Sequence, residues 1–262
     1  MQNLKIKNTQ QSTLRKSLRK QRLTRSPRQR KLASHQAFRR LSRLPITLPR
    51  YAKIGIYLDA FGEMPIQPII DWAKRHHFDL YLPIVLGKNK PLKFVKMAGY
   101  NPKKWRLIRH NLGMRQPART HKAITANQLD MVFLPLVAID KQGYRMGMGG
   151  GFYDRTLAKC HKKPIKIGWA YDFQLVEPLE INAWDIRLNF AILASQLLKF
   201  PRNDTIATLG QALTLENYGE NQEGIHGELS EQLISQVMNP DRLADLLQRA
   251  NAFERVHSEG FF

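Results

Sequence analysis

Short apolar segments alternate with helical segments along the middle of the chain. The apolar segments have the length of buried strands and cover residues 53–58, 79–85, 131–138 and 165–170. Helices are expected at residues 68–74 and near residues 153–160. Strands and helices that alternate at this spacing are typical of parallel pairing. The sequence therefore predicts an α/β fold with a three-layer, mostly parallel sheet and helices on both faces.

Two basic helices are expected before the first strand. Leu14 and Leu18 share helical spacing with Arg15, Arg19 and Arg22, so the first helix is predicted to have a positive face. Ser26 followed by Pro27 is typical of an N-cap and a first turn, and the second helix is expected to end near Arg43.

Charge divides the chain into three regions. Residues 1–53 contain 16 Lys and Arg and no acidic residue, whereas residues 201–262 contain 4 basic and 10 acidic residues. Composition after residue 200 is typical first of a linker and then of an amphipathic helix. We therefore expect an α/β domain at 1–200 and an acidic extension, partly linker and partly helical, at 201–262. The basic region, taken alone, is compatible with nucleic acid, an anionic membrane or an anionic small ligand.

Several protein classes are disfavoured. The single cysteine, Cys160, cannot form an internal disulfide and favours a reducing compartment. No apolar run reaches the roughly 18 residues of a membrane span, and the basic N-terminus lacks the apolar block of a secretory signal. A cytoplasmic protein without a membrane partner is expected.

A glycine-rich run carries the chemistry. Four glycines occur in five positions at 147–151, between Arg145 and Asp154. Glycines allow a backbone to approach a phosphate and to point successive N–H groups at it. The run is not a Walker A loop, since no Gly-Lys-Ser/Thr follows, and the surroundings of a dinucleotide fingerprint are missing. A nucleotide site is predicted; a glycine-rich turn packed against a strand is the structural alternative.

Further motifs occur in a fixed order over residues 11–195: Leu14-Arg15-Lys16, Ser26-Pro27, Tyr57-Leu58, Gly62-Glu63, Leu82-Pro83, Gln116-Pro117, the segment 134–140, Gly143, the glycine run with Tyr153-Asp154, Gln174, and Trp184-Asp185. With these motifs the chain resembles the 5-formyltetrahydrofolate cyclo-ligase family, also called methenyltetrahydrofolate synthetases. The resemblance implies ATP- and magnesium-dependent conversion of 5-formyltetrahydrofolate to 5,10-methenyltetrahydrofolate, with release of ADP and phosphate.

The resemblance also implies a role for each matched residue. The implied ATP contacts are Arg15, Arg145, Met146, Gly147, Met148, Gly149, Gly150, Gly151, Phe152 and Tyr153. The implied folate contacts are Tyr57, Leu58 and Glu63, with Met148, Gly149, Gly150, Gly151 and Phe152 as a wall shared by both ligands. Arg145 and Tyr153 are the implied catalytic residues, and Asp154 and Asp185 the implied Mg²⁺ ligands.

Some features leave alternatives open. Gln11 stands where the family usually has lysine, so the phosphate contact is either missing or supplied by Lys16 or Arg19. A folate-storage or regulatory protein with impaired turnover is one alternative, and a nucleic-acid-binding module that uses the basic helices is another. Against the latter, residues 1–53 offer only two aromatic side chains for base stacking. A monomer with two small-molecule substrates is expected.

Overall fold

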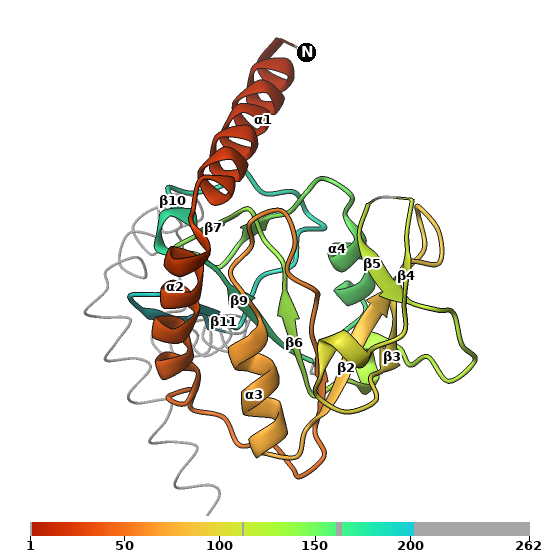
Figure 1. Ribbon diagram of the computed structural model, residues 1–262. Helices are drawn as coiled ribbons and strands as arrows, with labels where there is room; N and C mark the ends of the chain where they lie inside the picture. Colours follow the sequence, from red (N-terminus) through yellow and green to blue (C-terminus); the bar gives the residue numbers. More distant parts are fainter. Residues whose placement is uncertain (1, 112, 161–163, 202–262) are drawn as a thin grey trace, which may run out of the picture. The chain divides into compact units, whose positions relative to one another are not determined.

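A seven-stranded sheet forms the centre of the computed structural model, which describes residues 2–111, 113–160 and 164–201 (Figure 1). Its strands lie in the order β12-β11-β9-β6-β1-β2-β3. The four central pairings, from β11 through β9, β6 and β1 to β2, are parallel, and the two edge strands pair antiparallel. The strands are β1 (Lys53–Gly55), β2 (Asp79–Ile84), β3 (Lys93–Lys96), β6 (Met131–Leu134), β9 (Ile165–Trp169), β11 (Phe190–Ile192) and β12 (Leu197–Lys199).

Both faces of the sheet are covered, which confirms the predicted three-layer α/β architecture. Side chains of a strand alternate between faces, and all four residues of β6 are buried. Met131 and Phe133 belong to one core cluster with residues of α2 (Pro27–Leu41) and α3 (Gln67–Arg75). Val132 and Leu134 belong to a second cluster with Leu157 of the short helix α4 (Phe152–Leu157).

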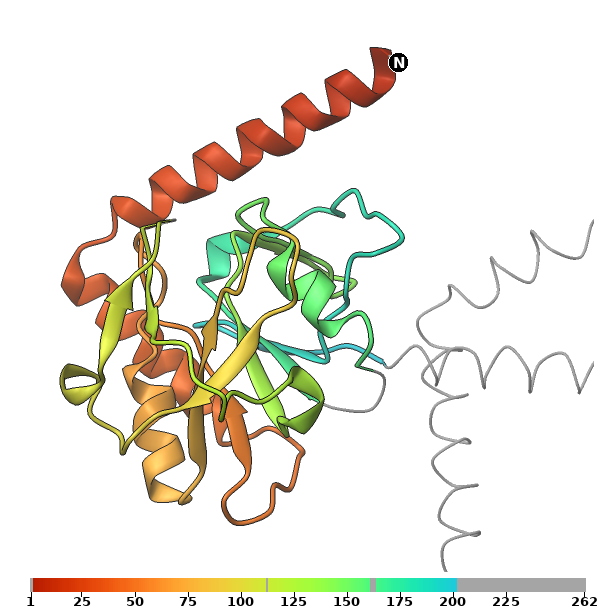
Figure 2. The same ribbon diagram turned by 90° about the vertical axis from the view of Figure 1, so that its right-hand side faces the viewer.

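The two basic helices form as predicted. The second helix, α2, begins after Ser26, whose side chain accepts a hydrogen bond from the backbone N–H of Gln29 in a capping box. The first helix, α1 (Gln2–Leu23), points its N-terminal end away from the sheet in both views (Figures 1 and 2). Leu18, in its C-terminal half, is buried against Val137, Ala138 and neighbouring side chains.

The prediction of one continuous strand over residues 131–138 is wrong. β6 ends at Leu134 because Pro135 has no N–H for the ladder. The chain then starts a second, three-stranded sheet in the order β10-β7-β8. It consists of β7 (Ala138–Asp140), β8 (Arg145–Met146) and β10 (Leu175–Val176). This small sheet carries the glycine run.

Other differences concern short elements. The strand expected at residues 53–58 spans only Lys53–Gly55. The connection between the strands predicted at 79–85 and 131–138 contains a hairpin of β4 (Leu107–Arg109) and β5 (Arg115–Pro117), for which no strand was predicted. Short 3-10 helices occur at Pro102–Lys104, Ala126–Gln128 and Asp172–Gln174. No helix of the described ranges is both long and apolar enough to cross a membrane. The predicted extension at 201–262 lies, apart from Pro201, outside the described residues.

Candidate active site

The glycine run forms the connection between β8 and α4. Gly149 and Gly151 have φ angles of 96° and 59°, in the left-handed region that favours glycine. A Cβ atom added at Gly147 or Gly149 would meet nothing within 4 Å, so the space beside this backbone is open. The loop therefore has the conformation and the room that a close backbone approach to a ligand requires. The alternative of a turn packed against a strand does not fit these two positions.

An ion pair closes the loop at its base. Arg145 Nη2 donates to Asp154 Oδ1 at 2.9 Å, and Arg145 Nη1 donates to the Ile186 carbonyl oxygen at 2.8 Å. The Ile186 N–H also donates to Asp154 Oδ1, at 3.3 Å. The Arg145 side chain is only 4% exposed, whereas that of Asp154 is 22% exposed. One bond thus joins the two ends of the glycine run to each other, and two bonds join them to the segment that follows Asp185.

Asp185 lies in a turn of its own. Its Oδ2 accepts from the backbone N–H of Asn182 at 2.7 Å and from Asn182 Nδ2 at 3.2 Å. The neighbouring Trp184 is 66% exposed. The two predicted Mg²⁺ carboxylates are therefore on adjoining segments, linked through Ile186.

Glu63 is the centre of a second, largely buried group. The Glu63 side chain is 11% exposed, and its Oε2 accepts from the Ala60 N–H at 3.0 Å. Burial raises the pKa of Glu63 to about 7, against smaller opposing effects of that N–H and of Arg22. Glu63 is thus a largely buried carboxylate and not an exposed residue of a turn.

Two tyrosines of the predicted site are near enough to feel the charge of the same carboxylate. Burial, and then the charge of Glu63, raise the pKa of both Tyr57 and Tyr153 well above the usual range. Their hydroxyls therefore remain neutral at physiological pH and can donate hydrogen bonds. Tyr57 belongs to the main core cluster and also lies near Glu63.

Two side chains of helix α1 bond to backbone carbonyl oxygens of the glycine loop and of residue 180. Arg15 Nε donates to the Gly147 carbonyl oxygen at 3.0 Å, so Arg15 is not simply part of a solvated face. Gln11, one turn earlier, donates through Nε2 to the Glu180 carbonyl oxygen at 3.0 Å. The phosphate contact suggested for Lys16 or Arg19 stays a prediction.

The remaining predicted residues, Leu58, Met148 and Phe152, all retain exposed surface. Met148 is 47% exposed, and Leu58 is partly buried. Phe152 lies beneath Arg155, whose guanidinium carbon is 5.2 Å from the ring centroid. An exposed methionine and a partly exposed ring beside an open backbone are suitable for apolar contact with a bicyclic ligand.

Sequence reasoning missed two residues that shape the site. Arg22, expected on a positive face, is 1% exposed and bonded to Glu63 and to the Leu136 carbonyl oxygen. Gln174 is buried and donates to the carbonyl oxygens of Leu136 and Val137, at 3.0 and 2.9 Å. The motif order singled out Gln174 without a role; it holds the chain where β6 leads into the small sheet.

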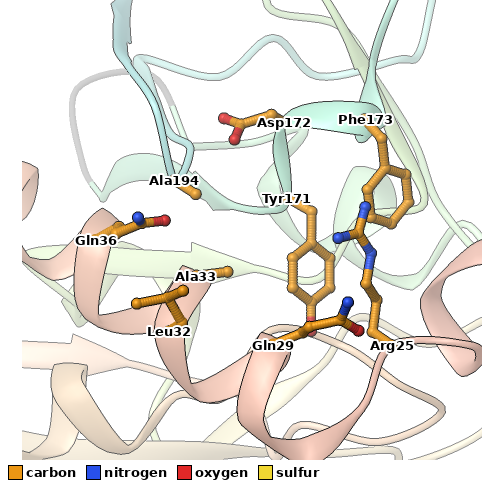
Figure 3. A pocket seen from close by; sticks show the side chains of 9 residues that line it. All are labelled: Arg25, Gln29, Leu32, Ala33, Gln36, Tyr171, Asp172, Phe173 and Ala194. Atoms are coloured by element: carbon orange, nitrogen blue, oxygen red, sulfur yellow. The ribbon is translucent and has the colours of Figure 1, made fainter.

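A separate hollow of about 180 Å³ lies between α2 and the segment 171–173 (Figure 3). Its lining includes none of the residues predicted for the site, and ligand pockets of drug size are larger, roughly 300–1,000 Å³. Arg25 lies 5.0 Å from the centroid of the Phe173 ring within it. The hollow touches the Glu63 loop only indirectly, through Tyr171, whose hydroxyl donates to the Gly62 carbonyl oxygen at 3.2 Å.

The donor set suits a Mg²⁺ ion that is shared with a ligand. No group of three or more His, Cys, Asp or Glu side chains in the described ranges could hold a metal by itself. Mg²⁺ commonly binds one or two carboxylates, keeps several waters and takes its other ligands from substrate phosphates. Asp154 and Asp185 fit that pattern.

The fold has counterparts among solved structures. The 5,10-methenyltetrahydrofolate synthetase of Aquifex aeolicus matches with a TM-score of 0.60 at 24% identity, over 83% of this chain and 97% of that one. The synthetase of Mycoplasma pneumoniae matches with a TM-score of 0.55 at 22% identity, over 70% of this chain and 97% of that one. At these identities the likeness shows the fold.

Sequence relatives show the family. The 5-formyltetrahydrofolate cyclo-ligase of Escherichia coli strain K12 is 32% identical over 184 residues, which are 69% of this chain and 98% of the relative. That of Haemophilus influenzae is 36% identical over 163 residues, 60% of this chain and 85% of the relative. The protein is thus an α/β ligase of folate metabolism. Residues 7–194 match the model of the 5-formyltetrahydrofolate cyclo-ligase family, and the chain belongs to that family.

Proposed function

We propose that this protein converts 5-formyltetrahydrofolate to 5,10-methenyltetrahydrofolate with ATP and Mg²⁺, releasing ADP and phosphate. The observation that carries the proposal is the pairing of an open glycine loop, closed by Arg145 and Asp154, with a buried carboxylate at Glu63. The loop suits a polyphosphate, because backbone N–H groups and an arginine are the usual donors to phosphate oxygens. The carboxylate suits the amino and ring N–H groups of a reduced pterin.

The chemistry requires activation of a poor leaving group. The formamide oxygen of the substrate attacks the γ-phosphorus of ATP, and ADP departs. The neighbouring folate nitrogen then attacks the formyl carbon, the C–N bond forms, phosphate leaves with the former formyl oxygen, and the proton of the attacking nitrogen is lost to the departing phosphate. Such transfer depends on in-line positioning and charge neutralisation more than on a protein nucleophile.

The residues of the loop would position the nucleotide. Arg145 and the amides of Gly147–Gly151 would hold the phosphates, and Arg15 would fix the loop through the Gly147 carbonyl oxygen. Asp154 and Asp185 would hold Mg²⁺, which neutralises phosphate charge when bound. The neutral Tyr153 hydroxyl would donate to the oxygen on which charge develops.

The folate would occupy the other side of the loop. Glu63 would accept from the pterin, with Tyr57 and Leu58 beside it. Met148 and Phe152 would form the wall between the two ligands, since Met148 belongs to the glycine loop, Phe152 begins the helix that follows it, and both retain exposed surface.

Nucleic acid is not the ligand that these features favour. Phe38 and Tyr51, the aromatic side chains of the basic region, each have an arginine over the ring, at 4.9 and 5.1 Å. Rings used in this way offer no row of stacking surfaces for successive bases. We further propose that the protein is a cytoplasmic monomer. Burial raises the pKa of the Cys160 thiol, which is in keeping with an inert structural cysteine.

Absorbance tests the proposal directly. The methenyl product has a near-ultraviolet band that the formyl substrate lacks. Protein mixed with substrate, ATP and Mg²⁺ should produce the band with one ADP released per product. Reactions without ATP, or with EDTA, serve as controls. Folded protein that binds both ligands without forming product would favour the storage or regulatory alternative instead.

A further inference from the structure

Arg22, in the last turn of α1, is a buried cation that the proposed reaction does not yet use. Its side chain is 1% exposed. Its Nη1 donates to the Leu136 carbonyl oxygen at 3.2 Å and lies 3.5 Å from Glu63 Oε1. Its Nε and Nη2 have no hydrogen-bond partner within the described part of the chain. Burying an incompletely bonded guanidinium costs several kcal/mol, so stability alone does not explain this residue.

Backbone contact fixes the separation of Arg22 and Glu63. Gly62 has a φ angle of 76°, and a Cβ atom there would lie 2.8 Å from the carbonyl carbon and oxygen of Arg22. The Glu63 loop thus rests directly on the end of α1. The bond from Tyr171 to the Gly62 carbonyl oxygen holds the same loop from the other side.

The same helix also holds the glycine loop. Arg15 and Arg22 are seven residues apart and therefore share one face of α1. Leu18, between them, is buried in the body of the domain. One arginine bonds to Gly147 and the other to Glu63, so a single rigid helix sets the positions of both loops.

We propose that Arg22 is a positioning residue that keeps the Glu63 carboxylate ionised and directed at the pterin ring. This inference rests on the proposed function. Glu63 is held on one oxygen by the Ala60 N–H and on the other by Arg22. The 3.5 Å separation is long for a charged hydrogen bond. It leaves the carboxylate able to accept from a ligand as well.

The pH dependence follows from the groups that face Glu63. Arg22 on α1 favours its ionised form, and Asp59 on its own loop opposes it. Tyr57 and Tyr153 stay neutral. Since burial places the pKa of Glu63 at about 7, the carboxylate is protonated progressively as the pH falls through that value. Folate capture should weaken over the same interval, and loss of Arg22 should move the interval to higher pH.

The experiment compares Arg22→Met and Arg22→Lys with the wild type. Arg28→Met is the matched control, because it removes one exposed arginine from the neighbouring helix. For each protein, kcat/KM for 5-formyltetrahydrofolate and KM for ATP are measured from pH 5.5 to pH 9, the sampled range being chosen around the Glu63 value. An Asp59→Asn background tests whether Asp59, whose pKa burial also raises, contributes to the profile.

Arg22→Met should raise the midpoint of the folate profile by about one pH unit, because a nearby opposite charge shifts a carboxyl pKa by roughly 1–3 units. Its KM for ATP should change less than its KM for folate. Arg22→Lys, which keeps the charge, should return the midpoint towards the wild type. Arg28→Met should leave the profile unchanged.

Two outcomes would overturn the inference. One is a wild-type midpoint and folate KM in Arg22→Met; the other is an equal shift in Arg28→Met. If Arg22→Met does not fold, Arg22→Lys and Glu63→Gln decide: Glu63→Gln must abolish the transition near pH 7, and its persistence refutes the assignment. Absence of turnover in the wild type would instead refute the proposed function, leaving the pH dependence of folate binding, followed by calorimetry, as the test of Arg22.

Discussion

Alanine at Gly149 should weaken ATP binding far more than its effect on stability explains. The added methyl group would meet no protein atom within 4 Å, so no packing clash arises. The φ angle of 96° is unfavourable for alanine, and such a left-handed conformation costs about 1–2 kcal/mol. For a domain of roughly 150–250 residues, this lowers the Tm by about 2–8 °C.

Gly99→Ala is the matched control for that strain. Gly99 also has a positive φ, 66°, and also has open space around its Cβ position. The two variants should lose similar stability. Only Gly149→Ala should lose ATP affinity, because its methyl group occupies the space beside the loop amides. Losing one hydrogen bond to a charged ligand, about 1.5–3 kcal/mol, weakens binding by roughly 10- to 150-fold.

A third variant separates strain from ligand contact altogether. Gly147 is outside the left-handed region and equally open, so Gly147→Ala should change stability by less than about 1 kcal/mol. Its ATP affinity should still fall. Thermal denaturation and calorimetric titration of ATP with Mg²⁺ measure the two quantities. Wild-type ATP affinity in folded Gly147→Ala and Gly149→Ala would refute the placement of the triphosphate at this loop.

Three further substitutions test the ligand assignments. Asp154→Asn should lower turnover at least about 100-fold, since it removes a charged ligand of Mg²⁺ and the partner of the buried Arg145. Full restoration of turnover by excess Mg²⁺ would show that loss of the ion pair with Arg145 contributes nothing to the defect. Arg145→Ala should raise the KM for ATP by roughly 10- to 150-fold and that for folate little, and the reverse pattern would exchange the two ligands. Gln11→Lys adds a cation one turn before Arg15 and should strengthen ATP binding by up to about fivefold at low salt; no gain would show that this position does not face the nucleotide.

The central fold could be predicted because parallel strands covered on both faces leave a clear trace in sequence. All four residues of β6 are buried, so the strand is a continuous apolar run. Its end was harder to predict. Leu136, Val137 and Ala138 beyond Pro135 are equally apolar, yet of these three only Ala138 lies in a strand, and that strand, β7, belongs to the second sheet. Composition alone does not show which sheet an apolar residue enters.

Some features of the site could likewise be predicted from the sequence, and others could not. The glycines could be found because four of them within five positions form a local pattern, and the left-handed angles of Gly149 and Gly151 favour glycine at those two positions. Arg145 and Asp154 could be found because they flank that run. They lie nine residues apart and pair with each other, but their contact with Ile186 joins segments 32 residues or more apart. No local pattern encodes that contact.

Arg22 shows what a charge count conceals. Among so many basic residues, its charge alone does not distinguish Arg22 from Lys16 or Lys20, which are exposed. Its spacing does distinguish it: it lies four residues after the buried Leu18 and seven after Arg15, on the stripe of α1 that packs against the domain. A cation on such a stripe must either extend to water or meet an acceptor inside. Arg22 is buried beside Glu63, the carboxylate that the family resemblance assigns to folate. The helical stripe therefore indicates which of the many arginines serves the site, and its test is the pH profile of folate capture.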